Sequence, residues 1–299
     1  MRKKFLAVMA AAIITTLAFT GCGNSSDSND GTTAGAGADS TAMTGAISVI
    51  SREDGSGTRG AFVELMGVVD EDENDITTQT AEITNSTSVM LKTVSQNEKA
   101  IGYVSLGSLS TDVKALQVDG ADATAENVKA GTYKVSRPFN ICYKEDKLTD
   151  LDKDFISYIM SDEGQAIVNE EGYIGLESEG SYKGSGQKGK ITLAGSTSVS
   201  PLMDKIKDAY TAVNPDVTIE IQESGSSAGI QAATEGAAQI GMSSRELKDE
   251  ELSAGLTSKQ IAMDGIAVIV NNSNPLTGLT SDQIKGIYTG ETTEWDAVK

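Results

Sequence analysis

Four short clusters of glycine, serine and threonine are the residues of this 299-residue chain best suited to chemistry. Small residues let an anion approach backbone N–H groups, and hydroxyl groups add donors aimed at the same point. Arg52 precedes the first cluster, and its guanidinium can donate two parallel hydrogen bonds to one oxyanion. Four such clusters and one arginine predict a site that encloses a small tetrahedral anion. The clusters are residues 54–58, 195–198, 225–229 and 243–245.

Two of the clusters also match motifs of other functions. Gly55, Gly57 and Gly60 form G-x-G-x-x-G after a strand-like run, the fingerprint of dinucleotide binding. Charged residues separate that run from the first glycine, however, where the fingerprint needs a tight turn. Residues 225–229 read G-x-S-x-G, the motif of a nucleophilic serine, but the chain contains no histidine to act as its base. Both interpretations are therefore disfavoured.

The composition narrows the function further. The chain has 24 Lys+Arg against 43 Asp+Glu, a formal net charge of −19, with no histidine and two cysteines. Nucleic-acid binding depends on clustered Lys and Arg, so no nucleic-acid partner is expected. The lack of histidine excludes Ser-His catalysis and His-ligated metals, and two cysteines are too few for a zinc site. We therefore expect no enzyme activity, no metal and no cofactor.

Strands and helices alternate along the chain and place each cluster where a strand ends and a helix begins. Such a junction offers the unpaired N–H groups and the partial positive charge of a helix N-terminus. The alternation predicts an α/β protein with largely parallel sheets. Thr280 and Gln283 predict a capping box at the start of the last helix. The expected strands are 47–51, 78–84, 100–106, 191–194, 217–222 and 239–242, and the expected helices are 61–69, 86–94, 200–213 and 284–288.

Three further segments suggest two lobes. Residues 132–144 and 259–271 are apolar, β-branched runs longer than a usual strand of about 5–6 residues, as expected for strands that pass between lobes. Residues 177–190 are polar and rich in glycine and serine, which predicts a linker in the middle of the chain. Cys142 lies in an apolar stretch and is expected to be a buried core thiol.

The N-terminus has the pattern of a secretory signal. Arg2, Lys3 and Lys4 precede an apolar run over 5–19, which is shorter than the roughly 20 residues of a membrane span. Cys22 follows Thr-Gly and resembles the cysteine of a bacterial lipobox, which is lipidated, although Phe19 stands where that motif usually has leucine. We expect a lipoprotein signal peptide over 1–22 and a disordered tether over 23–45.

Five segments together match the signature of one family. They are SREDGSGTRGAF at 51–62, AIGYVSL at 100–106, AGSTSVSPL at 194–202, GMSSREL at 241–247 and DGIAVIVN at 264–271. From 46 to 299 the chain thereby resembles the phosphate-binding proteins of Pst-type ABC transporters. The order of the segments differs. In that family the segment that matches 194–202 comes near the N-terminus and the one that matches 51–62 comes after it, whereas here 51–62 comes first. The chain is thus similar to a circular permutant of these proteins.

The resemblance implies a two-lobed, type II periplasmic-binding-protein fold with two crossover strands. Permutation would leave one lobe continuous over 138–266 and split the other between 46–137 and 267–299, with 177–190 joining the usual termini. The implied function is a monomeric, lipid-anchored receptor on the extracytoplasmic face of a bacterial membrane. It would capture inorganic phosphate and deliver it to an ABC transporter permease.

The resemblance also implies which residues bind the anion. Asp54 would orient Arg52 without touching the anion. The residues implied as ligands are Thr197 and Ser198 from one loop, Ser226 from a second, and Arg52, Ser56, Gly57 and Thr58 from a third.

Ser244 departs from the family, because some members place there an aspartate that accepts the proton of hydrogen phosphate. That position leaves open a receptor for another tetrahedral oxyanion such as sulfate. Arg245 adds either a second cation to the site or a surface charge. An extracellular nucleotide-binding or phosphoryl-transfer enzyme is the alternative from a different class, disfavoured by the absence of histidine and of a P-loop lysine.

Overall fold

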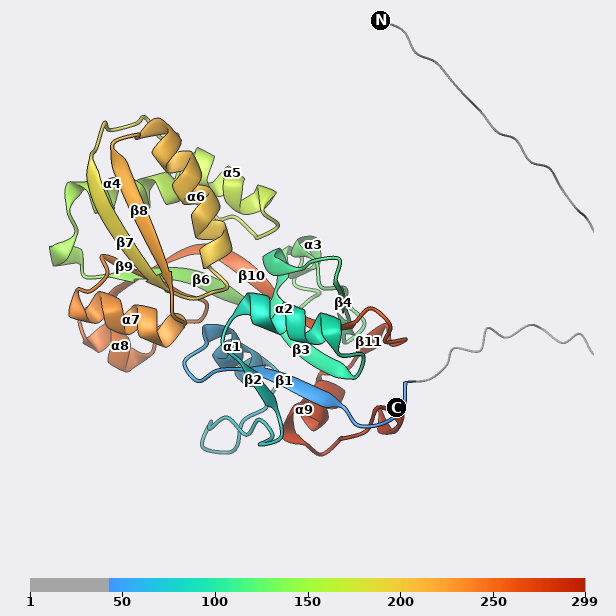
Figure 1. Cartoon of the computed structure of the whole chain (residues 1–299). Coiled ribbons are helices and arrows are strands. Elements are labelled where there is room, and N and C mark those ends of the chain that lie inside the picture. Colours follow the sequence, from blue (N-terminus) through green and yellow to red (C-terminus); the bar gives the residue numbers. More distant parts are fainter. Residues whose placement is uncertain (1–42, 299) are drawn as a thin grey trace, which may run out of the picture. The chain divides into compact units, whose positions relative to one another are not determined.

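The computed structural model describes residues 43–298. The expected signal peptide, Cys22 and tether residues 23–42 lie outside the described residues. Among those described, nine strands form one curled sheet in the order β2-β1-β3-β10-β6-β9-β7-β8, with β4 paired to β10 (Figure 1). These strands are β1 (Ser48–Arg52), β2 (Glu82–Thr84), β3 (Ala100–Ser105), β4 (Val113–Ala115), β6 (Ser136–Tyr143), β7 (Gly189–Gly195), β8 (Val217–Glu223), β9 (Ile240–Ser243) and β10 (Thr257–Asn271).

Helices flank the sheet and follow the strand ends in the expected alternation. Several of their starts are capped by side chains, among them α1 by Ser56. The capping box of Thr280 and Gln283 at α9 confirms that prediction. The helices are α1 (Gly57–Leu65), α2 (Thr87–Gln96), α3 (Ala125–Lys129), α4 (Asp150–Ile159), α5 (Asp162–Glu170), α6 (Ser200–Val213), α7 (Ser226–Glu235), α8 (Asp249–Ser253) and α9 (Ser281–Thr289). A separate two-stranded sheet pairs β5 (Gln117–Val118) with β11 (Gly278–Leu279).

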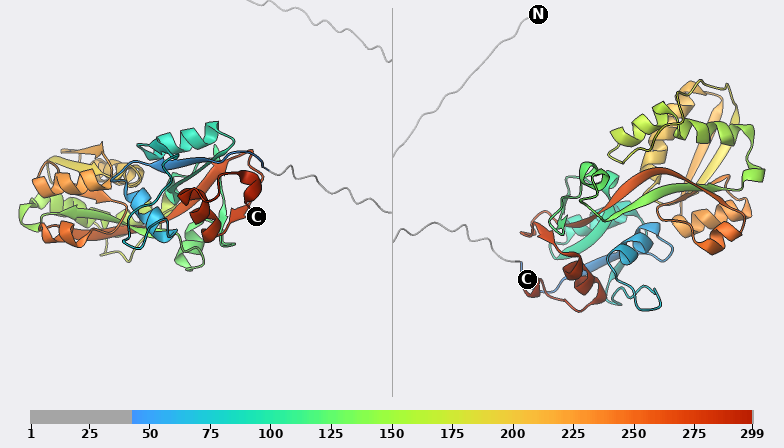
Figure 2. Two further views of the ribbon diagram at one scale, coloured as in Figure 1. Left: turned by 90° about the horizontal axis from the view of Figure 1, so that it is seen from below. Right: turned by 180° about the vertical axis from the view of Figure 1, so that it is seen from behind.

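The pairing in the sheet changes from parallel to antiparallel towards its middle. β1 pairs in parallel with β2 and β3, and β7 pairs in parallel with β8 and β9, as the alternation predicts. β10 runs antiparallel to β3 and β6, and β6 runs antiparallel to β9. At the centre of the antiparallel part are the two long strands, β6 and β10, which lie side by side through the middle of the molecule (Figure 2).

Two large apolar clusters lie on either side of these strands. One draws its buried side chains from between 139 and 262, around α4, α5, α6 and β7. The other draws them from between 49 and 135 and between 266 and 295, around α1, β3 and α9. We refer to them as core A (139–262) and core B (49–135 with 266–295). β10 contributes side chains to both cores, and β6, which begins directly after Val135 of core B, contributes Phe139 to core A. These two segments therefore connect the cores.

Several expected boundaries differ from the structure. The strand expected over 78–84 is restricted to Glu82–Thr84, because Thr78 and Ala81 form a turn against α9 instead. The strand expected over 132–144 begins at Ser136, because the N–H groups of Thr132 and Tyr133 donate to the carbonyl of Asn127. Residues 43–45, expected at the end of the tether, contact the C-terminal segment, where the N–H of Trp295 donates to the carbonyl of Gly45.

The polar segment 177–188 has no regular secondary structure, but its first half is fastened to core A. Ser178 and Ser181 donate to the carboxylate of Asp162, and the hydroxyl of Tyr182 donates to Asp154 at 2.7 Å. The ring of Tyr182 also packs edge-on against Tyr158. The composition did not predict these contacts, because they depend on side chains of α4 and α5.

Candidate anion-binding site

The strand ends predicted to bind an anion meet at one place in the structure. Arg52 at the end of β1 donates to Thr197 in the loop after β7. Ser244 after β9 donates to Ser226 at the start of α7. All eight residues expected as ligands are buried there. Gly57 is buried, and each of the other seven is 5% exposed or less. The eight are Arg52, Ser56, Gly57, Thr58, Thr197, Ser198, Ser226 and Ser244. Residues from both cores therefore converge on one site.

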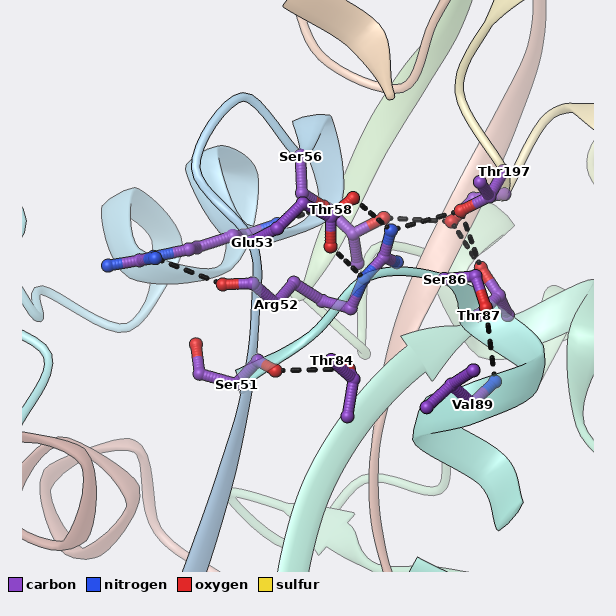
Figure 3. Close-up of polar contacts among 12 residues, drawn as sticks. Ser51, Arg52, Glu53, Ser56, Thr58, Thr84, Ser86, Thr87, Val89 and Thr197 are labelled. Atoms are coloured by element: carbon purple, nitrogen blue, oxygen red, sulfur yellow. Dashed lines mark hydrogen bonds and ion pairs between the residues drawn. The ribbon is translucent and has the colours of Figure 1, made fainter. Parts of the chain in front are cut away.

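Arg52 is the cation at the centre of this site. It is the last residue of β1, and its side chain is 2% exposed. Its Nη2 donates to Oγ1 of Thr197 at 3.0 Å, which links core B to the loop after β7 in core A (Figure 3). A buried guanidinium in such a position presents a fixed positive charge and planar N–H donors to an oxyanion.

A network of hydroxyl groups surrounds the arginine. Thr58 and Ser198 share a hydrogen bond of 2.8 Å across the two cores. In the loop after β7, Oγ of Ser198 and Oγ1 of Thr197 also lie 3.2 Å and 3.3 Å from Oγ1 of Thr87. Hydroxyls rotate and both donate and accept, so each of these groups can turn its hydrogen towards an anion.

Ser244 and Ser226 form the second half of the network. The N–H of Ser244 donates to Oγ of Ser226 at 3.1 Å, and Ser196 donates to Oγ of Ser244 at 2.9 Å. Ser226 is the first residue of α7, and Gly57 and Thr58 are the first residues of α1. The first N–H groups of a helix have no partner within the helix, so these helix starts add backbone donors and a partial positive charge.

Gly195 lets the strand ends approach this closely. Its φ of 143° lies in the region that favours glycine. A Cβ there would lie 2.2 Å from the carbonyl oxygen of Met242 in β9. Its own carbonyl accepts from the N–H groups of Ser224 and Gly225, which fixes the loop before α7. The glycine of this cluster is therefore required by packing.

The role expected of Asp54 is wrong, and Glu53 takes it. Oε2 and Oε1 of Glu53 accept from Nε and Nη2 of Arg52, both at 2.8 Å. The carboxylate of Asp54 is 97% exposed and pairs with Arg59 instead, at 2.8 Å. Consecutive residues after a strand end point in different directions, so only the residue next to Arg52 can return its carboxylate to the guanidinium.

Thr87 and Tyr103 contact the site although neither was expected there; Tyr103 lies within the 100–106 segment. Thr87 begins α2 at a strand–helix junction, after the cap Ser86, which is the same local signal as that of the four clusters. The hydroxyl of Tyr103 shares a hydrogen bond of 2.8 Å with Oγ of Ser51 and accepts another from the N–H of Arg52 at 3.1 Å. Burial raises the pKa of Tyr103 to about 12, so its hydroxyl stays neutral at physiological pH. It thereby holds the end of β1 in place.

Arg245 lies beside the site but is already engaged. Its Nη1 and Nη2 donate to the two carboxylate oxygens of Glu251 at 2.8 and 2.7 Å, and Nη2 also donates to Oγ of Ser227. Burial acts to raise the pKa of Glu251, but hydrogen bonds from Arg245 and the Lys248 backbone lower it below its usual value. Arg245 thus stabilises the loop that follows β9.

The described residues offer other features relevant to chemistry. A cavity of about 290 Å³ opens beside Thr87, Thr197 and Glu223. In residues 43–298 no three His, Cys, Asp or Glu side chains lie close enough together to hold a metal ion. Cys142 is buried and unpaired, which confirms its prediction as a core thiol. None of the helices in this part of the chain has the length and apolar character needed to cross a membrane.

Comparison with known proteins identifies the family. A model described as the PBP superfamily domain matches residues 27–163 and 180–298. "Phosphate-binding protein PstS 2" of Streptococcus agalactiae is 51% identical over 260 residues, 86% of this chain and 89% of that protein. "Phosphate-binding protein PstS" of Pseudomonas aeruginosa is 37% identical over 113 residues, 36% of this chain and 35% of that protein.

A solved structure agrees with these matches over most of the chain. It is described as a phosphate ABC transporter, phosphate-binding protein from Streptococcus pneumoniae. It is 47% identical with a TM-score of 0.69 and covers 85% of this chain and 100% of that one. Together with the location of the predicted residues at a single site, these matches show that the chain belongs to the PBP superfamily and, within it, to the PstS family of phosphate-binding proteins.

Proposed function

We propose that this protein captures inorganic phosphate at the site around Arg52 and delivers it to the permease of an ABC transporter. The observation that carries this proposal is the buried guanidinium of Arg52 within hydroxyl groups from both cores. A fixed cation, hydroxyls and helix N-termini provide donors from several directions, which suits a tetrahedral oxyanion. The relatives described above are named for phosphate binding, and the S. pneumoniae structure is described as a phosphate ABC transporter, phosphate-binding protein.

Binding would proceed by closure of the two cores around the anion. Core A contributes Thr197, Ser198, Ser226 and Ser244, and core B contributes Arg52, Ser56, Gly57 and Thr58. Within residues 43–298 the paired strands β6 and β10 connect the two cores through the sheet, so a hinge movement at these strands would open and close the site. None of these proposed ligands has a side chain whose ordinary pKa lies near neutrality.

The neutral Ser244 supports one alternative, a receptor for another oxyanion such as sulfate. An ionised carboxylate at this position would accept a hydrogen from hydrogen phosphate and would repel sulfate, which has no hydrogen to donate. A serine hydroxyl donates or accepts and makes no such distinction by itself. A direct comparison of the two anions separates these functions.

The cellular setting is part of the proposal. Cys22 would be lipidated after removal of residues 1–21 and would hold the protein on the extracytoplasmic face of a bacterial membrane. Residues 23–42 would then form the tether between the anchor and the folded part. The protein would act as a monomer, because the anion site is assembled from one chain.

We further propose that the chain is a circular permutant of some PstS proteins, such as that of P. aeruginosa, and that it shares its segment order with the relatives it matches over most of their length. The P. aeruginosa protein aligns with only about a third of either chain, as expected when the order of two halves differs. The start of the described chain also lies against its end, where Ala46 pairs with Glu294. In this arrangement residues 138–266 form one lobe, 46–137 and 267–299 form the other, and 177–190 join the usual termini.

Replacement of Arg52 tests the proposed function. Arg52→Ala removes the cation and leaves the Glu53 carboxylate without its partner, so phosphate binding should weaken by at least about 2 kcal/mol. Isothermal titration calorimetry measures this change. Lys190→Ala is the control, because its ion pair with Glu220 is half exposed and remote from the ligands. Equal phosphate affinity of the Arg52 variant and the wild type would exclude this site.

A further inference from the structure

A buried ion pair connects the two long strands at the junction of the cores. Arg137 in β6 lies directly opposite Asp264 in β10 in the antiparallel ladder. Their side chains are 2% and 0% exposed. Val135 and Ile266, on one side of the pair, belong to core B, whereas Phe139, on the other side, belongs to core A. The pair therefore lies where the chain passes from one core to the other.

Asp264 attaches this pair to core B. Its Oδ1 accepts from Oγ of Ser105 at 2.9 Å and from the N–H of Leu106 at 3.1 Å, at the end of β3. Its Oδ2 accepts from Nε and Nη2 of Arg137 at 3.2 and 3.0 Å. Four donors thus fix the carboxylate, and the carboxylate in turn fixes the plane of the guanidinium.

Arg137 attaches the pair to the anion site. Its remaining terminal nitrogen, Nη1, donates to the carbonyl oxygen of Ser244 at 3.2 Å. Ser244 is the residue whose N–H and hydroxyl bond Ser226 and Ser196 in the network described above. A continuous series of hydrogen bonds therefore runs from β3 through Asp264 and Arg137 to the anion-binding loop.

We propose that Arg137 is a positioning residue for the anion site, which holds the backbone of Ser244 at the hinge in the orientation that its N–H and hydroxyl require. This inference rests on the proposed function. A buried ion pair is weak support for stability, because desolvation cancels much of its attraction. The planar guanidinium of Arg137, however, can bind a carboxylate along one edge and a carbonyl with the remaining nitrogen, which a single ammonium group cannot do.

Arg137→Lys tests this role, because it retains the charge and removes the fork. We expect the backbone N–H groups of residues 243–246 to exchange with deuterium at least tenfold faster in the ligand-free variant. We also expect its phosphate dissociation constant to rise at least tenfold. The control is Ile284→Val, a change in core B on α9 that lowers the melting temperature without contact to the hinge pair. It should alter neither exchange at 243–246 nor phosphate affinity by more than twofold.

Asp264→Asn provides a second variant if the lysine variant does not fold. It keeps the shape of the side chain and removes the charge that orients the guanidinium, so exchange at 243–246 should again increase. The proposal would be overturned if a folded Arg137→Lys or Asp264→Asn variant exchanged at 243–246 at the wild-type rate. It would also be overturned if either variant lost no more phosphate affinity than the Ile284→Val control. The exchange measurement needs no ligand. It therefore decides the role of Arg137 even if the wild type fails to bind phosphate, which would refute the proposed function alone.

Discussion

Gly57 offers a sharp test of how closely the two cores approach at the anion site. It is the first residue of α1 in core B and has no side chain between the helix and the serines of core A. A Cβ at this position would lie 2.3 Å from Oγ of Ser226 and 2.7 Å from Oγ of Ser244. Ordinary contacts begin at 3.4 Å, and Cβ of Ser226 would lie 3.0 Å away, so in Gly57→Ala both hydroxyls must rotate away from the site or the cores must separate.

Either change should weaken binding and leave folding intact. Hydrogen bonds to a charged group contribute about 1.5–3 kcal/mol each, so losing the donors of Ser226 and Ser244 would cost at least about 3 kcal/mol. At about 1.4 kcal/mol per tenfold change, the affinity for phosphate would fall about 100-fold. Alanine has a higher helix propensity than glycine, so the variant's own helix is not weakened.

The assay is calorimetric titration with phosphate, accompanied by thermal unfolding of each variant. Gly60→Ala is the matched control, because it makes the same substitution one turn later in α1. Its Cβ would lie 3.6 Å from Cδ of Arg245, an ordinary contact, and phosphate affinity should stay within twofold of the wild type. Wild-type affinity in folded Gly57→Ala would refute the close approach of the cores around the ligand.

Three other predictions address selectivity, anchoring and pH. Ser244→Asp should raise the ratio of phosphate to sulfate affinity about tenfold, because its carboxylate accepts a hydrogen that sulfate lacks; an unchanged ratio in calorimetry would place selectivity elsewhere. Cys22→Ala should move the protein from the membrane fraction to the soluble fraction, and persistent membrane association would contradict the anchor. The folded pKa of Tyr103 is raised by burial to about 12, so its stabilising contribution is present below pH 10 and is lost as pH rises towards 12. Between pH 10 and 11 the free energy of unfolding, measured in urea, should therefore fall by about 1 kcal/mol more in the wild type than in Tyr103→Phe. Equal falls in the two proteins would contradict the raised pKa of Tyr103.

The location of the site was predictable because its signals are local. A cluster of small and hydroxyl residues after a strand predicts a helix N-terminus, and several such clusters with one arginine predict a common anion site. The clusters that contain Thr58, Ser198 and Ser226 could therefore be grouped with Arg52 from residue types and positions, whereas the individual ligands came from the family resemblance. The resemblance to a known family supplied the expected arrangement of the two lobes.

The remaining contacts depend on distances between segments far apart in the chain. The choice of Glu53 over Asp54 as the partner of Arg52 depends on the direction of each side chain after β1 ends. The contact of Arg137 with Ser244 depends on the register of β6 against β10 and β9. Composition also could not show that the segment around Tyr182 is fastened to Asp154, because α4 supplies that carboxylate.

The most direct test of the account is a calorimetric titration of the wild-type protein with phosphate, sulfate and a nucleotide under the same conditions. We predict saturable binding of phosphate at one site per chain, weaker binding of sulfate and no binding of the nucleotide. An absence of phosphate binding, or tighter binding of the nucleotide than of phosphate, would contradict a phosphate receptor.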